Sequence, residues 1–236
     1  MKKIQVMLMV MLVSSVLFAQ RTINDPNAEP RNLSGFHAIK ISNAFTVYIS
    51  QGNEDAVAIS ASKAEYKAKI ITKVENGVLK IYFEHGVNFN FGNKKLKAYV
   101  SFKTLDALHA SGGSDVYAED GINANNLEVR LSGGSDFRGK INSSALKMEA
   151  SGGSDVYVSG KANTLSVEAS GGSDFHGYDL VADICNVEAN GGSDVYITTN
   201  KEMNVSASGG SDVRYKGNGV IKNMNSSGSS SVKKAS

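Results

Sequence analysis

Apolar and polar residues alternate strictly along much of this chain. From Leu165 to Ser170 every second residue is apolar, which is the period of a β-strand with one buried face. Gly171 and Gly172 then interrupt the alternation, because glycine takes left-handed backbone angles that other residues avoid. The alternation resumes with Phe175 as the apolar member between two polar neighbours. The pattern predicts two short strands joined by a tight corner.

The corner phrase Ser-Gly-Gly-Ser-Asp recurs through the second half of the chain. Its aspartates follow one another at intervals of 21, 19, 19, 20 and 18 residues. A repeat near 20 residues is typical of a stacked array, in which no single rung can bury its apolar side alone. The copies are Ser111–Asp115, Ser132–Asp136, Ser151–Asp155, Ser170–Asp174, Asn190–Asp194 and Ser208–Asp212, followed by a decayed copy, Ser227–Ser231.

Stacking the repeats in register gives four columns of inward-facing apolar residues. They are Leu127, Leu146, Leu165, Cys185 and Met203; Val129, Met148, Val167, Val187 and Val205; Leu131, Ala150, Ala169, Ala189 and Ala207; and Val116, Phe137, Val156, Phe175, Val195 and Val213. Leucine-rich repeats and propellers fit less well, since the first need a leucine frame that is absent and the second about twice the period. The pattern predicts an all-β fold, a single-stranded parallel β-helix (a solenoid, right-handed) with rungs of about 18–21 residues.

The chain divides into a leader and one domain. Residues 1–19 have a positive start and an apolar core ending at Ala19, the layout of a secretory signal peptide. Residues 20–32 hold both prolines and are predicted to form a flexible leader. A single β-helix domain is expected over 33–236, with irregular leading rungs over 33–104 and regular rungs and a tail over 105–236. No transmembrane segment is expected in the mature chain.

The charge of the mature chain is balanced overall and uneven along its length. Without Lys2 and Lys3 it has 23 basic and 23 acidic side chains, which argues against a nucleic-acid partner. Residues 63–103 hold nine lysines against three glutamates, whereas residues 106–236 hold 11 basic and 16 acidic groups. The bias fits solvated faces, or a head-to-tail contact between copies in a homo-oligomer. Cys185 is the only cysteine and occupies a leucine position, so we interpret it as a small buried hydrophobe.

A column of aspartates is expected to point outward at the corners. Neighbouring rungs lie ~4.8 Å apart, so adjacent carboxylates repel by roughly 1 kcal/mol in water. The favoured interpretation is that each carboxylate accepts hydrogen bonds at its own Gly-Gly corner. Calcium is the alternative, with Asp136, Asp155 and Asp174 as candidate ligands, although the glycine spacing of calcium-binding repeats is not kept. No other cofactor is expected. The column is Asp115, Asp136, Asp155, Asp174, Asp194 and Asp212.

A second outward column lies two residues beyond each aspartate. Aromatic residues and potentially cationic ones alternate in it, which predicts a ladder of cation–π contacts and ion pairs. The alternative is a strip that binds glycans by stacking sugar rings on tyrosines two rungs apart. Its members, candidate ligand contacts together with the aspartates, are Tyr117, Arg138, Tyr157, His176, Tyr196 and Arg214.

Catalysis is not expected. Polysaccharide lyases and hydrolases are built on β-helices, which makes Asp155, Asp174, His176 and Arg138 the residues to consider for such an alternative. Their equivalents recur in other rungs, however, and a catalytic pair needs one copy rather than six.

Three motifs of the leading strands accompany the corner phrases. They are Gly35-Phe36-x-x-Ile39-x-Ile41, Val47-x-Ile49-x-Gln51-Gly52 and Gly77-Val78-Leu79-x-Ile81. Through these motifs and the corner phrases the chain resembles the bacterial family called putative auto-transporter adhesin, head GIN domain. The resemblance covers essentially the whole mature chain and implies an exported β-helix protein with a surface or adhesive role; it supplies no catalytic residue.

The expected function is therefore recognition without catalysis. We expect a protein exported to the periplasm, the outer membrane surface or the exterior, which binds polysaccharide or another protein through a repetitive face. The alternative is a structural protein of the envelope that associates with itself, through its basic leading region or an open sheet edge.

Overall fold

The computed structural model describes residues 24–84 and 94–235. The predicted signal peptide, residues 1–19, lies outside these ranges. Across the described part of the chain, no helix combines the length and the apolar character needed to cross a membrane.

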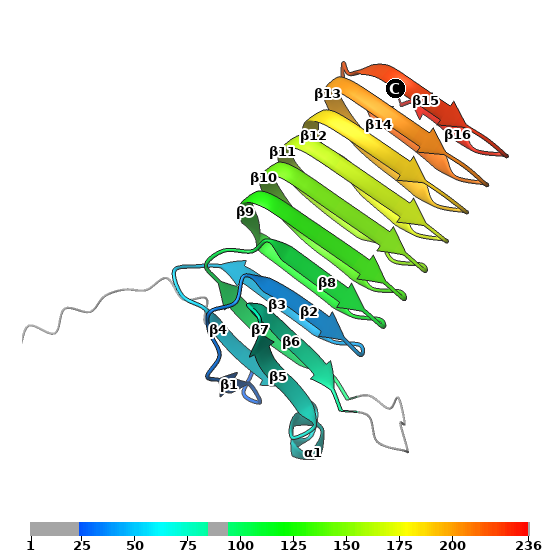
Figure 1. Cartoon of the computed structure of the whole chain (residues 1–236). Coiled ribbons are helices and arrows are strands. Elements are labelled where there is room, and N and C mark those ends of the chain that lie inside the picture. Colours follow the sequence, from blue (N-terminus) through cyan, green and yellow to red (C-terminus); the bar gives the residue numbers. More distant parts are fainter. Residues whose placement is uncertain (1–23, 85–93, 236) are drawn as a thin grey trace, which may run out of the picture.

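The chain folds into a β-solenoid of about 7 turns, as the sequence predicts (Figure 1). The long strands turn from one face of the solenoid to the next, and each pairs in parallel with the strand of the next rung, for example with Leu146 opposite Leu165. The strands of the regular part are β8 (Ala107–Ser111), β9 (Asp115–Ser132), β10 (Asp136–Ser151), β11 (Val156–Ser170), β12 (Asp174–Ala189), β13 (Asp194–Ala207), β14 (Asp212–Lys216), β15 (Val220–Ser226) and β16 (Ser231–Lys234).

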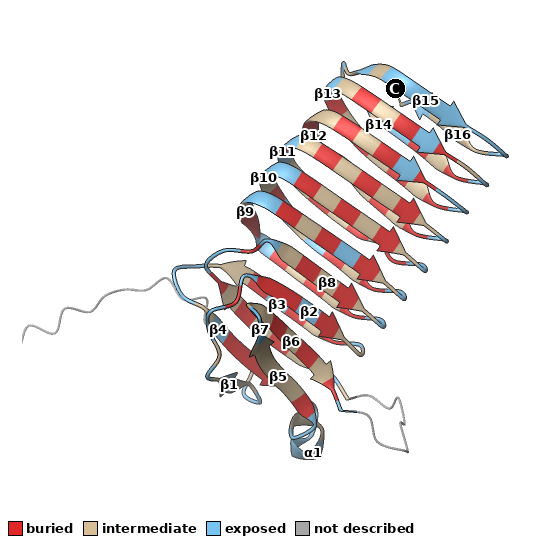
Figure 2. Ribbon diagram, in the orientation of Figure 1, coloured by how far each residue is buried: buried red, intermediate tan, exposed pale blue. Residues whose placement is uncertain are grey.

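The four predicted inward columns form the core. Every member is buried, and in β8 to β14 buried positions alternate with more exposed ones over much of each strand (Figure 2). Cys185 is fully buried among them, and this burial raises the pKa of its thiol to about 11. Its interpretation as a small buried hydrophobe is confirmed. Parallel pairing keeps the core columns in register, so like positions stack on like and one repeated alternation produces one continuous core.

The leading segment closes one end of the solenoid, and its rungs are not in sequence order. Strand β3 lies between β7 and β9, and β2 lies between β6 and β8. The β2–β3 rung is therefore inserted between two rungs formed later in the chain. The strands concerned are β2 (Ala38–Ser42), β3 (Thr46–Gln51), β6 (Val78–Phe83) and β7 (Lys97–Phe102).

A corner without glycine explains how the β2–β3 rung fits the stack. Ser42 is in register with Ser111, and Thr46 with Asp115, so residues 42–46 occupy the place of a corner phrase. Asn43 and Ala44 take positive φ angles of 76° and 59°, and the Ala44 N–H donates to the carbonyl of Gly112 at 2.9 Å. The shape of the corner is kept although its sequence is not.

Antiparallel pairs cover this end of the solenoid. Strand β5 (Ile70–Glu75) forms a hairpin with β6 through the Asn76–Gly77 turn, and β4 (Ala56–Ser60) pairs antiparallel with β7. The short helix α1 (Ala64–Lys67) follows β4. The leading part therefore departs from a purely parallel helix, because antiparallel strands end the stack.

The described part of the predicted flexible leader differs from that expectation. Strand β1 (Glu29–Arg31) pairs antiparallel with β4. Ahead of it, the Asp25 carboxylate accepts a hydrogen bond from the Tyr99 hydroxyl at 2.9 Å and lies 3.7 Å from the Lys97 ammonium. These contacts attach residues 25–31 to the domain, and the two prolines are tolerated because one precedes the strand and the other lies in an edge strand.

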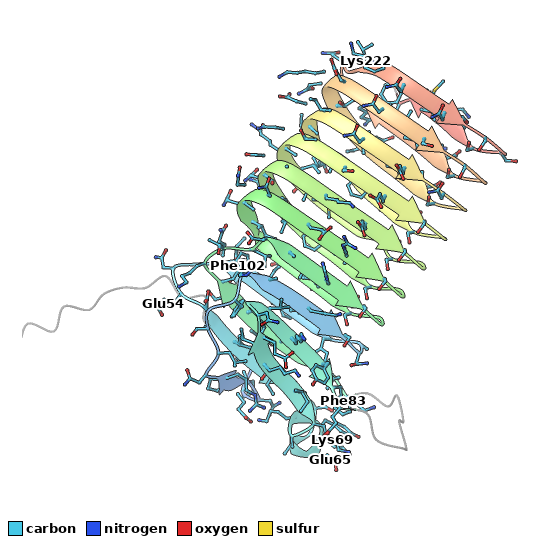
Figure 3. The ribbon with its side chains drawn as sticks, viewed as in Figure 1. Glu54, Glu65, Lys69, Phe83, Phe102 and Lys222 are labelled. Carbon is cyan, nitrogen blue, oxygen red and sulfur yellow. The ribbon has the colours of Figure 1, made fainter. Side chains whose placement is uncertain are left out.

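The opposite end of the solenoid is open. Strands β15 and β16 form the last rung, and no described strand pairs with their outer side. Val220 is 60% exposed and Met224 is 56% exposed. Residues 213–236 contain five basic side chains and no acidic one, and Lys222 projects from this end (Figure 3).

Candidate ligand-binding face

The aspartate column runs along one face of the solenoid in register. Asp115 lies opposite Asp136, and Asp194 lies opposite both Asp174 and Asp212. All six side chains are half-buried. The predicted column therefore exists, and its partners decide how the repulsion between carboxylates is offset.

Three of the six carboxylates, those of Asp136, Asp174 and Asp212, accept a hydrogen bond from the next rung, which differs from the expected bonding within their own corners. Asp136 Oδ1 accepts the backbone N–H of Asp155 at 3.2 Å, and Asp174 Oδ1 accepts that of Asp194 at 3.3 Å. At the open end, the Ser231 hydroxyl donates to Asp212 at 2.6 Å. A carboxylate that accepts a bond from the next rung also holds the two rungs in register.

The second serine of each corner phrase lies inside the solenoid. The Ser154 hydroxyl, for example, donates to the carbonyl of Ser151 at 2.9 Å and accepts the backbone N–H of Ser135, the equivalent serine of the previous rung, at 3.1 Å. The alternation of the sequence could have predicted this burial. Each aspartate faces outward, so the serine directly before it faces inward. These fully buried serines are Ser114, Ser135, Ser154, Ser173, Ser193 and Ser211.

Their burial bears on the calcium alternative. A hard cation at Asp136, Asp155 and Asp174 would be held without the serines next to them, because those hydroxyls are bonded in the core. In residues 24–84 and 94–235, no group of three or more His, Cys, Asp or Glu side chains is placed to hold a metal ion.

The second outward column forms a stacked ladder. The His176 ring lies between Tyr157 and Tyr196, with centroid distances of 4.5 and 5.3 Å and interplanar angles of 11° and 8°. The Arg138 guanidinium lies 4.2 Å from the Tyr157 centroid, and that of Arg214 lies 6.0 Å from Tyr196. The contacts predicted between cations and rings are present at these positions.

The ladder continues beyond the residues that the sequence predicts. Tyr48 stacks on both Tyr117 and Tyr99 with centroids 5.5 Å apart, and Lys233 is in register with Arg214 at the open end. Aligning Val47-Tyr48 with Val116-Tyr117 would have found Tyr48, had the leading rungs been placed in the stack. In spatial order, the aromatic ladder is Tyr99, Tyr48, Tyr117, Arg138, Tyr157, His176, Tyr196, Arg214 and Lys233.

Stacking determines which part of each ring a ligand can reach. His176 fills the space between Tyr157 and Tyr196, so no sugar ring fits between these two tyrosines. The ladder presents ring edges and hydroxyl groups along the face instead of open ring faces. Stacking of sugars on tyrosines two rungs apart therefore does not suit the geometry here.

An open groove of about 690 Å³ lies beside the middle of the ladder. Tyr178 meets Tyr196 edge-on, at 5.4 Å and 66°, and the Lys216 ammonium lies 4.5 Å from the centroid of the Tyr178 ring. Tyr178 is not among the predicted site residues, since it lies two positions beyond the second outward column; β12 continues through Gly177 to reach it. Among the lining residues are Lys140, Tyr157, His176, Tyr178, Asp179 and Tyr196.

Comparison with known proteins gives one matching family and several solved structures of similar fold. The sequence profile of the family described as "Putative auto-transporter adhesin, head GIN domain" matches residues 35–219. A search of functionally curated proteins gives no match.

Solved structures share the fold at low sequence identity. A putative adhesin from Bacteroides fragilis is 18% identical, with a TM-score of 0.81 over 88% of this chain and 96% of that one. A putative lipid binding protein from Parabacteroides distasonis is 18% identical, with a TM-score of 0.67 over 90% and 98%. A putative adhesin from Parabacteroides merdae is 14% identical, with a TM-score of 0.67 over 89% and 95%.

Proposed function

The chain belongs to the putative auto-transporter adhesin, head GIN domain family, and from this membership we propose an exported, non-enzymatic recognition protein that binds polysaccharide along its aromatic ladder. The observation that carries the proposal is the continuity of that ladder. Nine side chains in register follow one face from β7 to β16. A straight, rigid and repetitive face of this kind suits an extended polymer.

The chemistry of the face supports a polymer rich in hydroxyl groups. Phenol hydroxyls both donate and accept hydrogen bonds, and the neighbouring carboxylates accept them. Tyr196 already donates to Asp194 at 3.3 Å, which shows that the two columns lie within hydrogen-bonding distance of each other. A sugar chain lying along both columns would exchange bonds of this kind at successive rungs.

The repetition of the site supports the absence of catalysis. Arg138, Tyr157 and His176 lie in register with one another on neighbouring rungs, and aspartates recur in register beside them, for example Asp115 with Asp136 and Asp174 with Asp194. Reaction sites need a unique arrangement of an acid and a base, whereas affinity for a polymer gains from equal contacts. We therefore assign no lyase or hydrolase activity to the protein.

Export to the cell surface or envelope fits the same proposal. The family name and the names of two of the similar structures refer to adhesins, and residues 1–19 have the layout of a signal peptide.

A carbohydrate array tests the function. We expect the wild-type protein to bind at least one polysaccharide, and the triple variant Tyr117→Ala, Tyr157→Ala, Tyr196→Ala to lose that binding. Tyr82→Ala is the matched control, since Tyr82 is a half-buried tyrosine on β6, away from the ladder. Equal binding by the wild type and the triple variant would contradict a site on the ladder, and no binding by the wild type would leave protein recognition as the function.

Self-association is the second candidate, because the open end favours it. Val220 and Met224 are exposed there beside an unpaired strand edge. Pairing of two such ends would strengthen with salt, which screens their basic charges, whereas contact of a basic end with the acidic body of another copy would weaken with salt. Sedimentation velocity at low and high salt separates the two modes. A monomer under both conditions would remove this candidate.

A further inference from the structure

The rungs of the solenoid differ in the number of residues that follow the aromatic ladder position. Gly139 pairs with Ala118 and Ile141 with Ile122, so residues 119–121 of β9 face a single residue of β10. On the other side, Gly177 pairs with Ile197 and Val181 with Thr198, so residues 178–180 of β12 have no counterpart in β13. Extra residues on a strand bend it outward from its neighbours.

The two bulges enclose the groove. Its lining includes Gly139 of β10 with Val158 and Ser159 of β11, and the bulged strands contribute Glu119 of β9 and Tyr178 of β12. Strands β9 and β12 are three rungs apart, about 14 Å. Small side chains on a short floor between two raised ends make a trough long enough for one or two sugar rings.

Tyr178 is set differently from the rings of the ladder. Its plane crosses that of Tyr196 at 66°, so its faces are not covered by stacking within the ladder. The Lys216 ammonium lies over the Tyr178 ring and does not line the groove, whereas Tyr178 does. The Thr198 hydroxyl donates to the Tyr178 carbonyl at 2.8 Å and holds the bulge in place.

Charge selects the class of ligand. Residues 106–212 carry 16 acidic and 6 basic side chains, so the body of the solenoid repels anionic polymers. In the groove, Asp179 is exposed and has no hydrogen bond or ion pair with any described residue. Its carboxylate can accept bonds from sugar hydroxyls but would repel a uronic acid.

We infer that this groove is the main sugar subsite of the face, and that it takes a pyranose ring of a neutral glycan. The pyranose ring would lie against the face of Tyr178 that Lys216 does not cover, and the Asp179 carboxylate would accept hydrogen bonds from the sugar hydroxyls. The inference rests on the proposed function, and it adds the position of the subsite and the class of ligand.

Titration calorimetry with defined hexasaccharides tests the subsite. The neutral probes are cellohexaose, mannohexaose, xylohexaose and chitohexaose, and the anionic probe is hexagalacturonate. We expect binding of at least one neutral probe, and binding about tenfold weaker or worse in Tyr178→Ala, since the stacking surface is lost. Tyr178→Phe keeps the ring and should bind within about twofold of the wild type. Asp179→Asn should weaken neutral binding, and Tyr82→Ala should not change it.

The outcomes separate the two proposals. If Tyr178→Ala binds as the wild type does while the triple ladder variant loses binding, the function holds and the subsite is wrong. Tighter binding of hexagalacturonate than of every neutral probe would overturn the ligand class. If the wild type binds no carbohydrate on the array or in the calorimeter, the proposed function itself fails. Thermal melts of each variant show whether a loss of binding reflects unfolding.

Discussion

The six aspartates of the outward column share one position but differ in environment. Asp136 and Asp174 accept a backbone N–H from the following rung, and Asp212 accepts the Ser231 hydroxyl. For Asp115, burial and then the charge of Asp136 raise the pKa of the carboxyl, and Arg138 opposes the shift only in part. The repulsion between neighbouring carboxylates is therefore offset by different partners at different rungs.

Replacing Asp115 by asparagine should stabilise the fold at neutral pH. Folding raises the pKa of this carboxyl, so its charged form is disfavoured in the native state and its cost is fully present above the folded pKa. The cost disappears as pH falls below the unfolded value of about 3.9. We expect the Tm of Asp115→Asn to exceed that of the wild type at pH 7 and the difference to vanish near pH 3.

Thermal melts followed by circular dichroism across this pH range measure the effect. Asp179→Asn serves as the control, because that carboxylate is exposed and should change the Tm little at either pH. A lower Tm for Asp115→Asn at pH 7, or a difference independent of pH, would contradict the assignment.

At the scale of elements, the two corner glycines have different roles. The first takes a positive φ in every rung, whereas the second does so in Gly113, Gly134 and Gly153 but not in Gly172, Gly192 and Gly210. The decayed corner agrees with this trend, since Ser229 stands at the second position and Gly228 remains at the first.

Gly191 and Gly192 therefore make a matched pair of substitutions. A Cβ at Gly191, where φ is 76°, would lie 2.9 Å from the carbonyl oxygen of Gly171, whereas one at Gly192 would lie at an ordinary 3.7 Å from that atom. Gly191→Ala should cost at least about 1–2 kcal/mol through its left-handed backbone, with strain from the close contact in addition. Gly192→Ala should be neutral or slightly stabilising, because alanine has fewer unfolded conformations.

Chemical denaturation of both variants checks this difference. Comparable losses of unfolding free energy in the two would mean that the corners in the later rungs are not built as the backbone angles indicate.

Elements were predictable where the sequence repeats and not where it stops repeating. Alternation and the corner phrase place all four core columns, because parallel stacking in register converts sequence period into spatial neighbours. The position of the inserted β2–β3 rung was not predicted, because Asn43 and Ala44 form the corner without its glycines. The bulge at Tyr178 was not predicted either, because extra residues in one rung can be recognised only when the pairing register with the neighbouring rungs is known.

At the scale of the whole molecule, the two ends differ in stability. Antiparallel strands β4 and β5 and the edge strand β1 close one end, whereas the last rung at the other end is covered on one side only. In a solenoid each rung contacts only its neighbours, so local opening is easiest where one neighbour is missing.

Hydrogen exchange should therefore follow a gradient along the solenoid. We expect amides of β15 and β16 to exchange fastest among the described strands, and amides of β10 and β11, which have full rungs on both sides, to exchange slowest. Mass spectrometry of peptides from each rung measures the order within one sample. Faster exchange in β4 and β7 than in β15 would show that the antiparallel strands do not close their end.

The open last rung also determines how the protein would respond to mechanical load. A pull on its carboxyl end would detach β16 and β15 first and then the remaining rungs one after another, since each is held by its neighbour alone. With repeats of 18–21 residues, every detached rung would lengthen the tether by about 70 Å. A molecule that extends in such steps absorbs mechanical work gradually instead of at a single rupture.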